Sequence, residues 1–327
     1  MSNRRLDITP VSSPLRAAFA ISRGSKTSAE TVRVRVQQGE RTGWGECVPY
    51  GRYGETIESV TATIETLREA LEAGLTRADL QAQMPAGAAR CAVDCALWDL
   101  EAKMTGTPVW QLAGLPEPKP VETAVTVSLD TPEKMAEAAR AIQGQLLKLK
   151  LGGAEDLKRI EAVHVARPDA RLIVDANEGL VPAEFPNISR AAAALGVVLI
   201  EQPFPAGDDA ALERRPGPVA ICADESAHTA ADMQDLARRY DAVNVKLDKA
   251  GGLTEALAMV RAAKACGMGV MVGCMVAGSL SMAPAVLLAG LCDAADLDGP
   301  LWLKDDVAHG LTYRDGMVEP PSSGLWG

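Results

Sequence analysis

Charged residues recur at the ends of short apolar segments from about residue 121 onward. Each segment is rich in Val, Ile or Leu, and a lysine or an acid lies at or near its end. In chain order these residues are Lys148, Lys150, Asp175, Glu201, Asp224, Lys246, Asp296 and Asp298. Carboxylate oxygens suit a hard divalent cation, and lysine is able to act as a base when its pKa is lowered. The set therefore indicates metal-assisted proton transfer, provided that the fold brings its members together.

The spacing of these segments indicates the elements that position them. Polar residues near their ends recur every 22 to 26 residues from Lys150 to Lys246, and Ala-rich stretches of helical period lie between them. This alternation predicts parallel βαβ units. The predicted strands are 122–128, 146–151, 171–175, 197–201, 219–224, 242–246, 270–273 and 294–298. Seven helical stretches connect them and none follows the last, so we expect an α/β fold with a (β/α)7β modified TIM barrel.

The first 120 residues follow a different pattern and predict an α+β capping domain. Strand-like pieces at 31–37 and 43–47 precede helical stretches at 56–73 and 86–105. The segment 116–120 contains three prolines, which interrupt a helix, and we interpret it as the linker. The barrel is then expected over 121–304, and the polar tail 305–327 is expected to complete the capping domain.

In such a barrel the reactive groups lie at the carboxyl ends of the strands. Asp175, Glu201 and Asp224 end the third, fourth and fifth predicted strands, so their carboxylates should converge on one side of the barrel mouth. They would repel one another unless a cation neutralised them, and this favours Mg²⁺, with Mn²⁺ as a substitute. The alternative is that each acid caps the following helix.

Two lysines are predicted to face each other across the same mouth. Lys150 ends the second strand and Lys246 the sixth, which is half a turn around eight strands. Lys148 shares a face with Lys150, and its charge together with the metal is expected to lower the pKa of Lys150. A divalent ion on a carboxylate acidifies the neighbouring C–H bond, so one lysine could remove that proton and the other return one to the opposite face. The alternative is that these lysines are solvated surface charges.

Composition and charge exclude several other classes of protein. The net charge of −10 and the pI near 5.0 argue against nucleic acid as the main partner. The chain has neither a signal-like apolar start nor an apolar run long enough to span a bilayer, so no membrane role is predicted. Seven scattered cysteines lack metal-site spacing and indicate reduced thiols in a cytoplasmic protein. Homo-oligomer formation is left open.

Several motifs resemble the muconate-lactonising subgroup of the enolase superfamily. They are Lys148-Leu-Lys150, Asp175-Ala-Asn177, Glu201-Gln-Pro203, Ala223-Asp-Glu-Ser226 and the segment 244–252. The segment 87–100 resembles the helix that joins cap and barrel in that family, so the likeness covers nearly the whole chain. Within the subgroup, segments 273–275 and 295–300 are similar to those of dipeptide epimerases, especially those acting on L-Ala-D/L-Glu in murein peptide recycling.

The resemblance implies an isomerase that inverts the Glu α-carbon by proton transfer between two bases. Asp175, Glu201 and Asp224 would bind one Mg²⁺ per subunit through their carboxylates. Lys150 would serve the L epimer and Lys246 the D epimer. The α-proton would leave through a metal-stabilised enolate, which is the scheme that the family uses.

The resemblance also implies how a dipeptide would be held. Asp296 and Asp298 are expected on one face of the eighth strand, where they could bind the α-ammonium group of the first residue. We expect Arg23, in the cap segment 22–27 that also offers Lys26, to pair with the side-chain carboxylate of the second residue, beneath a closing segment at 48–53. Thr126 and Lys148 are the other predicted substrate-binding residues. Without the family context, these residues would be ordinary loop charges and a strand Thr.

Three alternatives remain at this stage. Another reaction of the subgroup, such as o-succinylbenzoate synthesis or cycloisomerisation, would use the same lysines and metal, but Asp296 and Asp298 would repel an anionic substrate that lacks an ammonium group. Dehydration of the mandelate racemase kind is disfavoured because segment 270–279 contains no His. A non-catalytic binding barrel is the third alternative, although none of the predicted metal ligands or lysines is missing.

Overall fold

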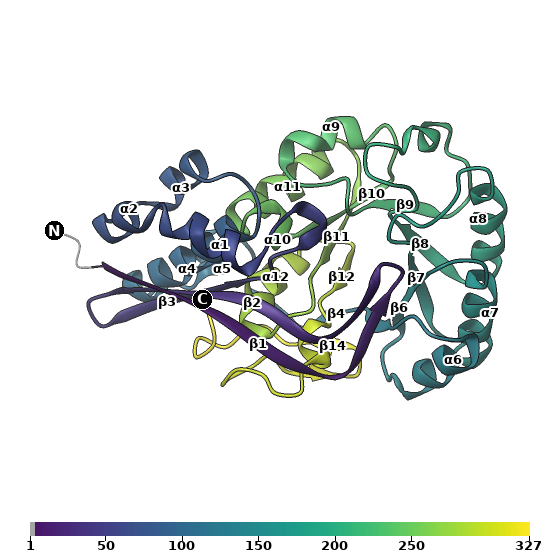
Figure 1. The fold of residues 1–327 in the computed structure, drawn as a ribbon, viewed down its shortest axis with the longest axis horizontal. Coiled ribbons are helices and arrows are strands. Elements are labelled where there is room, and N and C mark those ends of the chain that lie inside the picture. The colour runs from purple at the N-terminus through teal and green to yellow at the C-terminus, as the bar shows by residue number, and fades with distance from the viewer. Residues whose placement is uncertain (1–3) are drawn as a thin grey trace.

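The computed structural model describes residues 4–327 and divides into a sheet with helices at one end and a barrel at the other (Figure 1). The first part is an antiparallel sheet of β1 (Arg4–Ile21), β2 (Gly24–Gln38) and β3 (Arg41–Cys47). Its helices are α1 (Ile57–Glu65), α2 (Arg68–Ala73), α3 (Arg77–Gln83), α4 (Ala88–Thr105) and α5 (Val109–Leu112). No helix among residues 4–327 is long and apolar enough to cross a membrane.

The barrel is a parallel sheet of eight strands in sequential order, which confirms the predicted α/β class and barrel architecture. Its strands are β5 (Val125–Val127), β6 (Leu146–Lys150), β7 (Arg171–Asp175), β8 (Val197–Glu201), β9 (Ala220–Ala223), β10 (Ala242–Lys246), β11 (Gly269–Gly273) and β12 (Ala294–Asp296). Most interior residues of these strands are buried aliphatic side chains, as is usual for parallel strands covered on both faces.

The first and last barrel strands meet at a seam that is joined differently from the other strand pairs. The residues described here form no continuous ladder between β5 and β12. Instead, the Ala124 amide donates to the Ala295 carbonyl at 2.7 Å, and the Leu297 amide donates to Thr123 Oγ1 at 2.8 Å. The seam is therefore closed by individual hydrogen bonds, some of which go to side chains.

The barrel helices follow the prediction except at two connections. They are α6 (Pro132–Ala141), α7 (Asp156–Ala166), α8 (Phe185–Ala194), α9 (Met233–Leu236), α10 (Leu247–Ala250), α11 (Leu253–Ala265) and α12 (Ser279–Ala289). Between β8 and β9 the expected helix is replaced by a 3-10 helix at Ala210–Arg214, because prolines on both sides leave little room for a longer one. Between β9 and β10 the helical structure is a 3-10 turn followed by the single turn α9.

Other elements also differ from the sequence-based expectation. Strand β1 was not predicted, and it pairs with β2 along nearly its whole length despite a register shift between Pro14 and Phe19. The helix expected over 56–73 is split into α1 and α2. The strand expected over 122–128 is also split, because β4 (Val121–Glu122) pairs instead with β14 (Met317–Val318), which pairs with β13 (Tyr313–Arg314).

Helix α4 connects the sheet with the barrel. On one side it packs against β3 so closely that an added Cβ at Gly45 would lie 2.0 Å from the Ala92 carbonyl oxygen. On the other side Arg90 Nη2 donates to the Ala250 carbonyl at 2.7 Å, beside the end of β10. At the C-terminal end of the chain, Trp326 Nε1 donates to the Trp44 carbonyl at 2.9 Å. The first sheet is thus held at a defined place beside the barrel strand that carries Lys246.

Candidate active site

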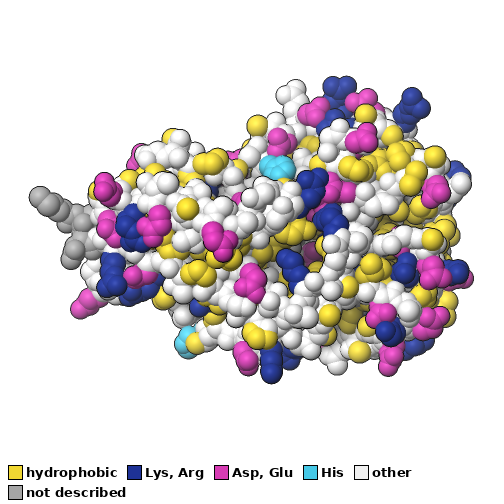
Figure 2. Space-filling model, in the orientation of Figure 1, with side chains coloured by type: hydrophobic (Ala, Val, Ile, Leu, Met, Phe, Trp, Pro, Cys, Tyr) yellow, Lys and Arg dark blue, Asp and Glu magenta, His cyan; other side chains and the backbone are white. Residues whose placement is uncertain are grey.

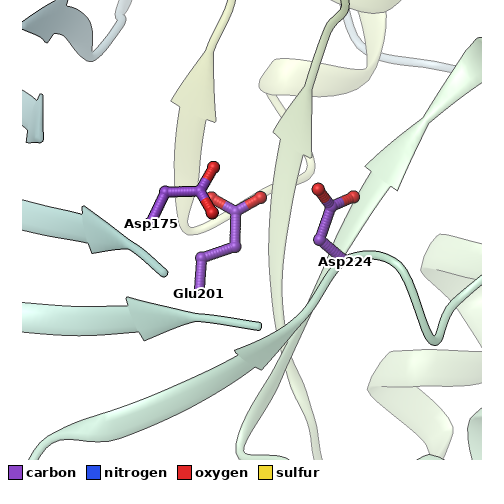
Figure 3. A group of neighbouring side chains, drawn as sticks. All are labelled: Asp175, Glu201 and Asp224. Atoms are coloured by element: carbon purple, nitrogen blue, oxygen red, sulfur yellow. The ribbon is translucent and has the colours of Figure 1, made fainter. Parts of the chain in front are cut away.

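Three carboxylates converge at the carboxyl ends of adjacent barrel strands. Asp175 and Glu201 are register partners at the last positions of β7 and β8, and Asp224 directly follows β9. One oxygen of each lies within 4.8 Å of the others, and all three side chains are buried. Figure 3 shows the three carboxylates turned toward one another. The structure therefore brings together the three residues that the sequence predicted as metal ligands.

Lys148 lies in the middle of these acids. Its Nζ is 2.6 Å from Glu201 Oε2, 2.7 Å from Asp296 Oδ2 and 3.2 Å from Asp175 Oδ2, and the side chain is 1% exposed. Burial opposes its protonation, but the charges of Asp296 and Glu201 outweigh burial and raise the pKa of Lys148 well above its usual value. Lys148 is consequently a fixed positive charge below the mouth.

Lys150 and Lys246 reach one cavity from opposite sides of the barrel. Lys150 is on the second barrel strand and Lys246 on the sixth, four positions apart in the sheet order. Lys150 Nζ lies 2.6 Å from Asp175 Oδ2, and Lys246 Nζ lies 2.7 Å from Asp224 Oδ2. Both lysines line a cavity of about 380 Å³ between the barrel mouth and two loops of the N-terminal sheet. Each lysine thus lies closest to a different acid of the three-carboxylate group.

The lysine ammonium groups weaken the argument, made from sequence, that the three acids need a metal ion to offset their mutual repulsion. They already neutralise much of the negative charge of the acids, so repulsion alone does not require a metal ion. Two observations still fit a divalent cation: three hard carboxylate oxygens converge, and Glu201 Oε2 lacks a well-directed hydrogen bond even though Lys148 is 2.6 Å away. Burial and the charge of Asp175 raise the pKa of Glu201 to about 7, whereas Lys150 and Lys148 overcome burial and hold the pKa of Asp175 well below its usual range.

Two further residues contact the acids and were assigned no role from sequence. Asn244 Nδ2 donates to Glu201 Oε1 at 2.6 Å, and Lys249 Nζ lies 2.6 Å from Asp224 Oδ1. Asn244 is two positions before Lys246 on β10, so strand alternation places both side chains on one face and could have identified it. Lys249 lies in the short helix α10, where no periodic signal marks it.

Asp296 and Asp298 are both buried but have different partners. Asp296 ends β12 and pairs with Lys148, while its Oδ1 has no hydrogen-bond partner among residues 4–327. Asp298 lies beyond the strand, and its Oδ2 accepts from the Thr126 amide at 2.7 Å and from Trp302 Nε1 at 3.2 Å. Burial and the nearby charge of Asp296 raise the pKa of Asp298 to about 6. Thr126 thus contacts the site through its backbone, across the seam.

Arg23 lies at the tip of the β1–β2 hairpin and is held by acids of the barrel loops. Its Nη2 is 2.7 Å from Glu225 Oε1, and its Nη1 is 3.2 Å from Glu178 Oε2. Arg52 donates from Nη2 to Glu178 Oε1 at 2.8 Å and from Nε to Oε2 at 2.9 Å. We call Arg23, Arg52, Glu178 and Glu225 the rim cluster. Figure 2 shows basic side chains around a hollow on this face of the molecule.

The backbone after β7 brings the rim acid Glu178 into position. Asn177 and Glu178 have φ angles of 43° and 69°, in the left-handed region that non-glycine residues rarely occupy. Glu178 Oε1 also accepts from the Ala206 amide at 2.8 Å. Glu178 and Glu225 follow metal-ligand candidates by one to three residues, but sequence reasoning did not identify them as partners of the cap.

Two known domain families match the chain. The N-terminal domain of mandelate racemase / muconate lactonizing enzyme matches residues 4–114, and the enolase C-terminal domain-like family matches residues 131–325. The chain belongs to the mandelate racemase / muconate lactonizing enzyme family. Its membership confirms the resemblance to the muconate-lactonising subgroup of the enolase superfamily that the strand-end motifs indicated.

Relatives within this family include dipeptide epimerases. L-Ala-D/L-Glu epimerase of Escherichia coli K12 is 46% identical over 93% of this chain and 96% of its own. A solved enolase family member from Agrobacterium tumefaciens, with bound sodium and L-Ala-L-Glu, is 51% identical with a TM-score of 0.96, covering 99% and 100% of the two chains. The dipeptide epimerase of Enterococcus faecalis V583, complexed with Mg and L-Leu-L-Tyr, is 28% identical with a TM-score of 0.92 over 100% and 99%.

Proposed function

We propose that this chain is a Mg²⁺-dependent dipeptide epimerase that inverts the Glu α-carbon of L-Ala-D/L-Glu. The observation that carries the proposal is the opposed pair Lys150 and Lys246, which share one cavity beside three convergent carboxylates. Similarity to the Escherichia coli epimerase along nearly the whole of both chains supports the choice of substrate. The reaction is an isomerisation, so no second substrate is needed.

The residues of the chain divide the proton transfer between them. A divalent cation held by Asp175, Glu201 and Asp224 would supply positive charge beside the substrate carboxylate and make the adjacent C–H bond more acidic. Lys150 Nζ then takes the α-proton of the L epimer, and Lys246 Nζ delivers a proton to the opposite face. The two lysines exchange these roles when the D epimer reacts. Lys148 stays protonated and keeps the acids in place.

The ammonium group of the first residue is assigned to the acids at the end of β12. The unpartnered Oδ1 of buried Asp296 supports this assignment, because a buried carboxylate oxygen is stabilised by a charged donor. Asp298 lies next to it and adds negative charge. Thr126 positions Asp298 through its amide, and Lys148 positions Asp296, so both act on the substrate through an acid.

The proposal extends to the organisation and location of the protein. Residues 1–120 and the tail 305–327 are assigned to a cap over a barrel formed by 121–304, which is supported by the bond from Trp326 to Trp44. All seven cysteines are free thiols, which supports a reducing cytoplasmic compartment, where murein-derived dipeptides would be recycled.

The decisive test is exchange of the Glu α-proton in D₂O. The protein is incubated with Mg²⁺ and L-Ala-L-Glu, and the α-proton signal and the appearance of the D epimer are followed by NMR. We expect both exchange and epimerisation, and we expect a chelator to stop both. N-acetyl-L-glutamate, which lacks the ammonium group, should react much more slowly.

The outcomes separate the class of reaction from the substrate. Reaction with other dipeptides but not with L-Ala-L-Glu would reassign the substrate. If no dipeptide tested showed exchange or epimerisation, the epimerase class would be excluded.

A further inference from the structure

A buried amide side chain directly follows Glu201, one of the three convergent carboxylates. Gln202 is completely buried, and its φ angle of 33° lies in the left-handed region that non-glycine residues rarely occupy. A residue keeps such a conformation only where the surrounding contacts hold it there. The contacts of Gln202 therefore indicate what it does.

Gln202 contacts the segments that carry all three carboxylates. Its backbone amide donates to the Cys222 carbonyl at 2.9 Å, and its carbonyl accepts from the Glu178 amide at 2.8 Å. Its side-chain Oε1 accepts from the Asp224 amide at 2.8 Å and from the Ser226 amide at 3.1 Å. One residue thus joins the carboxyl ends of β7, β8 and β9, where the three carboxylates of Figure 3 lie.

The orientation of the Gln202 amide group is fixed by the acceptors around its nitrogen. Nε2 lies 2.8 Å from the Phe204 carbonyl oxygen and 2.9 Å from both Tyr240 Oη and Ser226 Oγ. Both hydroxyls in turn donate to Asp209 Oδ2, Tyr240 at 2.6 Å and Ser226 at 3.0 Å. A reversed amide would place its NH₂ group against two backbone N–H groups, so only one orientation satisfies every partner.

Asp209 is the charged end of this set of bonds. It directly precedes the 3-10 helix at Ala210–Arg214, is 4% exposed, and has Arg239 Nε 3.1 Å from its Oδ1. Burial and the hydrogen bond to Asp209 raise the pKa of Tyr240 above its usual value, so the hydroxyl stays a donor. Each hydroxyl therefore directs its proton at Asp209 and a lone pair at Gln202. We call Gln202, Ser226, Tyr240 and Asp209 the amide network.

We propose that Gln202, oriented by the rest of the amide network, is the positioning residue that sets the spacing of the three carboxylates for a divalent cation. Metal ligands that are held in place by outer hydrogen bonds bind their ion more tightly than ligands without them. This inference rests on the proposed function, because it presumes that the three carboxylates bind a divalent cation. It adds the residues that hold those carboxylates through the backbone.

The first readout is binding of Mn²⁺ alone, without substrate, followed by the EPR signal of the free ion. Gln202→Met keeps the approximate size of the side chain and removes both of its hydrogen-bonding ends. The dissociation constant of Mn²⁺ should rise roughly 10- to 100-fold. The double variant Tyr240→Phe/Ser226→Ala leaves Oε1 in place but frees the amide to turn, so the dissociation constant should rise less, by about 2- to 10-fold.

The second readout is epimerisation of L-Ala-L-Glu at increasing Mg²⁺. In both variants the Mg²⁺ concentration that gives half-maximal activity should rise in step with the dissociation constant. The value of kcat at saturating Mg²⁺ and the KM for the dipeptide should change by less than about threefold, because the amide network donates no group to the substrate. A general loss of structure would lower all of these quantities together.

Tyr313→Phe is the matched control. It also removes a tyrosine hydroxyl that is bonded inside the protein, since Tyr313 Oη donates to the Leu297 carbonyl at 2.7 Å. This hydroxyl has no bond to the amide network. Urea unfolding should show a loss of stability, and the Mn²⁺ dissociation constant should stay unchanged.

Unchanged Mn²⁺ binding in both the Gln202 variant and the double variant would overturn the inference. An equal weakening in Tyr313→Phe would also overturn it, because affinity would then follow general stability. If Gln202→Met does not fold, the double variant alone decides.

Failure of the proposed function gives a different result. An unmodified protein that binds no Mn²⁺ would overturn both the metal site and this inference. A protein that binds Mn²⁺ and responds to the substitutions as expected, but epimerises no dipeptide, would support the amide network and reject the proposed reaction.

Discussion

The charged group inside the barrel mouth and the rim cluster both combine acids with cations, but they use different cations. In the interior group every cation is a lysine: Lys148, Lys150, Lys246 and Lys249. In the rim cluster both cations are arginines. Lysine is able to lose its proton when its surroundings favour the neutral form, whereas arginine stays charged and grips carboxylates with two parallel bonds. The interior lysines therefore permit proton transfer, which we assign to Lys150 and Lys246, whereas the arginines of the rim cluster can only position.

The two groups also differ in how deeply their cations are buried. The side chains of Lys148 and Lys249 are at most 1% exposed, while those of Arg23 and Arg52 are 29% and 37% exposed. Removing one partner of a buried pair leaves an uncompensated charge, which is strongly destabilising. Exposed pairs are screened by water and salt, and each contributes little. Substitutions in the two groups should consequently differ in size and in kind.

The largest effect is expected at the interior lysines. Lys246→Ala should abolish epimerisation, with a loss of roughly 10²- to 10⁴-fold, because it removes one of the two bases. Exchange of the α-proton of L-Ala-L-Glu in D₂O should persist through Lys150, as NMR would reveal. Lys246→Arg keeps the charge beside Asp224 but not a usable base, so it should behave in the same way. Full epimerisation by either variant would refute the two-base scheme.

A smaller effect is expected one step away from the acids, at Asn244. Asn244→Leu removes the donor to Glu201 Oε1 and leaves the three carboxylates in place. Loss of such a supporting hydrogen bond typically weakens metal affinity about 10- to 100-fold. The Mg²⁺ concentration that gives half-maximal activity should rise accordingly, while activity at saturating Mg²⁺ should fall far less. An unchanged Mg²⁺ titration would contradict the assigned role of this amide.

Substitutions in the rim cluster should have smaller effects on activity, and these effects should not depend on the charge of the substrate. Glu178→Gln removes the charge that binds Arg23 and Arg52, and we expect KM to rise a few-fold for both L-Ala-L-Glu and L-Ala-L-Gln with little change in kcat. Because the pairs are partly exposed, the free energy of unfolding should fall by only about 1 kcal/mol. Steady-state kinetics at low and high salt provide the check, since added salt should raise KM more for the unmodified protein than for the variant. A large fall in kcat would place Glu178 with the interior group instead.

Asp248 offers a third case, a buried acid without a cation partner in the described residues. Its Oδ1 accepts from the Val48 amide at 2.7 Å, and burial together with the charges of Glu55 and Glu46 raises its pKa to about 7. The folded state then holds an extra proton between about pH 4 and pH 7, so this group makes the protein less stable as pH rises through that range.

Asp248→Asn keeps the acceptor for Val48 and removes this pH dependence. The variant should gain stability relative to the unmodified protein as pH rises from 4 to 7, by at most about 1.4 kcal/mol per pH unit, with activity nearly unchanged. Urea unfolding of both proteins at several pH values measures this difference in the free energy of unfolding. Parallel stability profiles for the two proteins would show that the carboxyl of Asp248 titrates normally.

Sequence predicted the barrel and its strand-end residues because both follow from local pattern. Buried parallel strands are continuous apolar runs, and the residue that ends each run lies at the mouth whatever the side chains around it. Asp175, Glu201 and Asp224 could be located in this way without a structure. The long strand β1 could not, because Pro10 and Pro14 and its polar residues resemble a loop until β2 is seen to pair with it.

The ion pairs of the rim cluster could not be predicted from sequence, because they join residues far apart in the chain. Arg23 and Glu225 are 202 positions apart in the chain, and nothing in either neighbourhood signals the other. Sequence could therefore name cations able to bind a substrate carboxylate, but it could not tell which of them the chain had already neutralised. That distinction needs the tertiary contacts of each side chain.

The seam between β5 and β12 has fewer backbone hydrogen bonds than the other strand pairs of the barrel, so we expect local opening to cost least there. Amides within a continuous ladder are protected from hydrogen exchange as a group, whereas the Thr126 amide is protected by the carboxylate of Asp298. A bound cation that pulled the Asp298 carboxylate away from Thr126 would raise the exchange rate of the Thr126 amide. A bound cation that held the carboxylate in place would lower that rate. In either case, deuterium uptake at this one backbone amide would report whether the site is occupied.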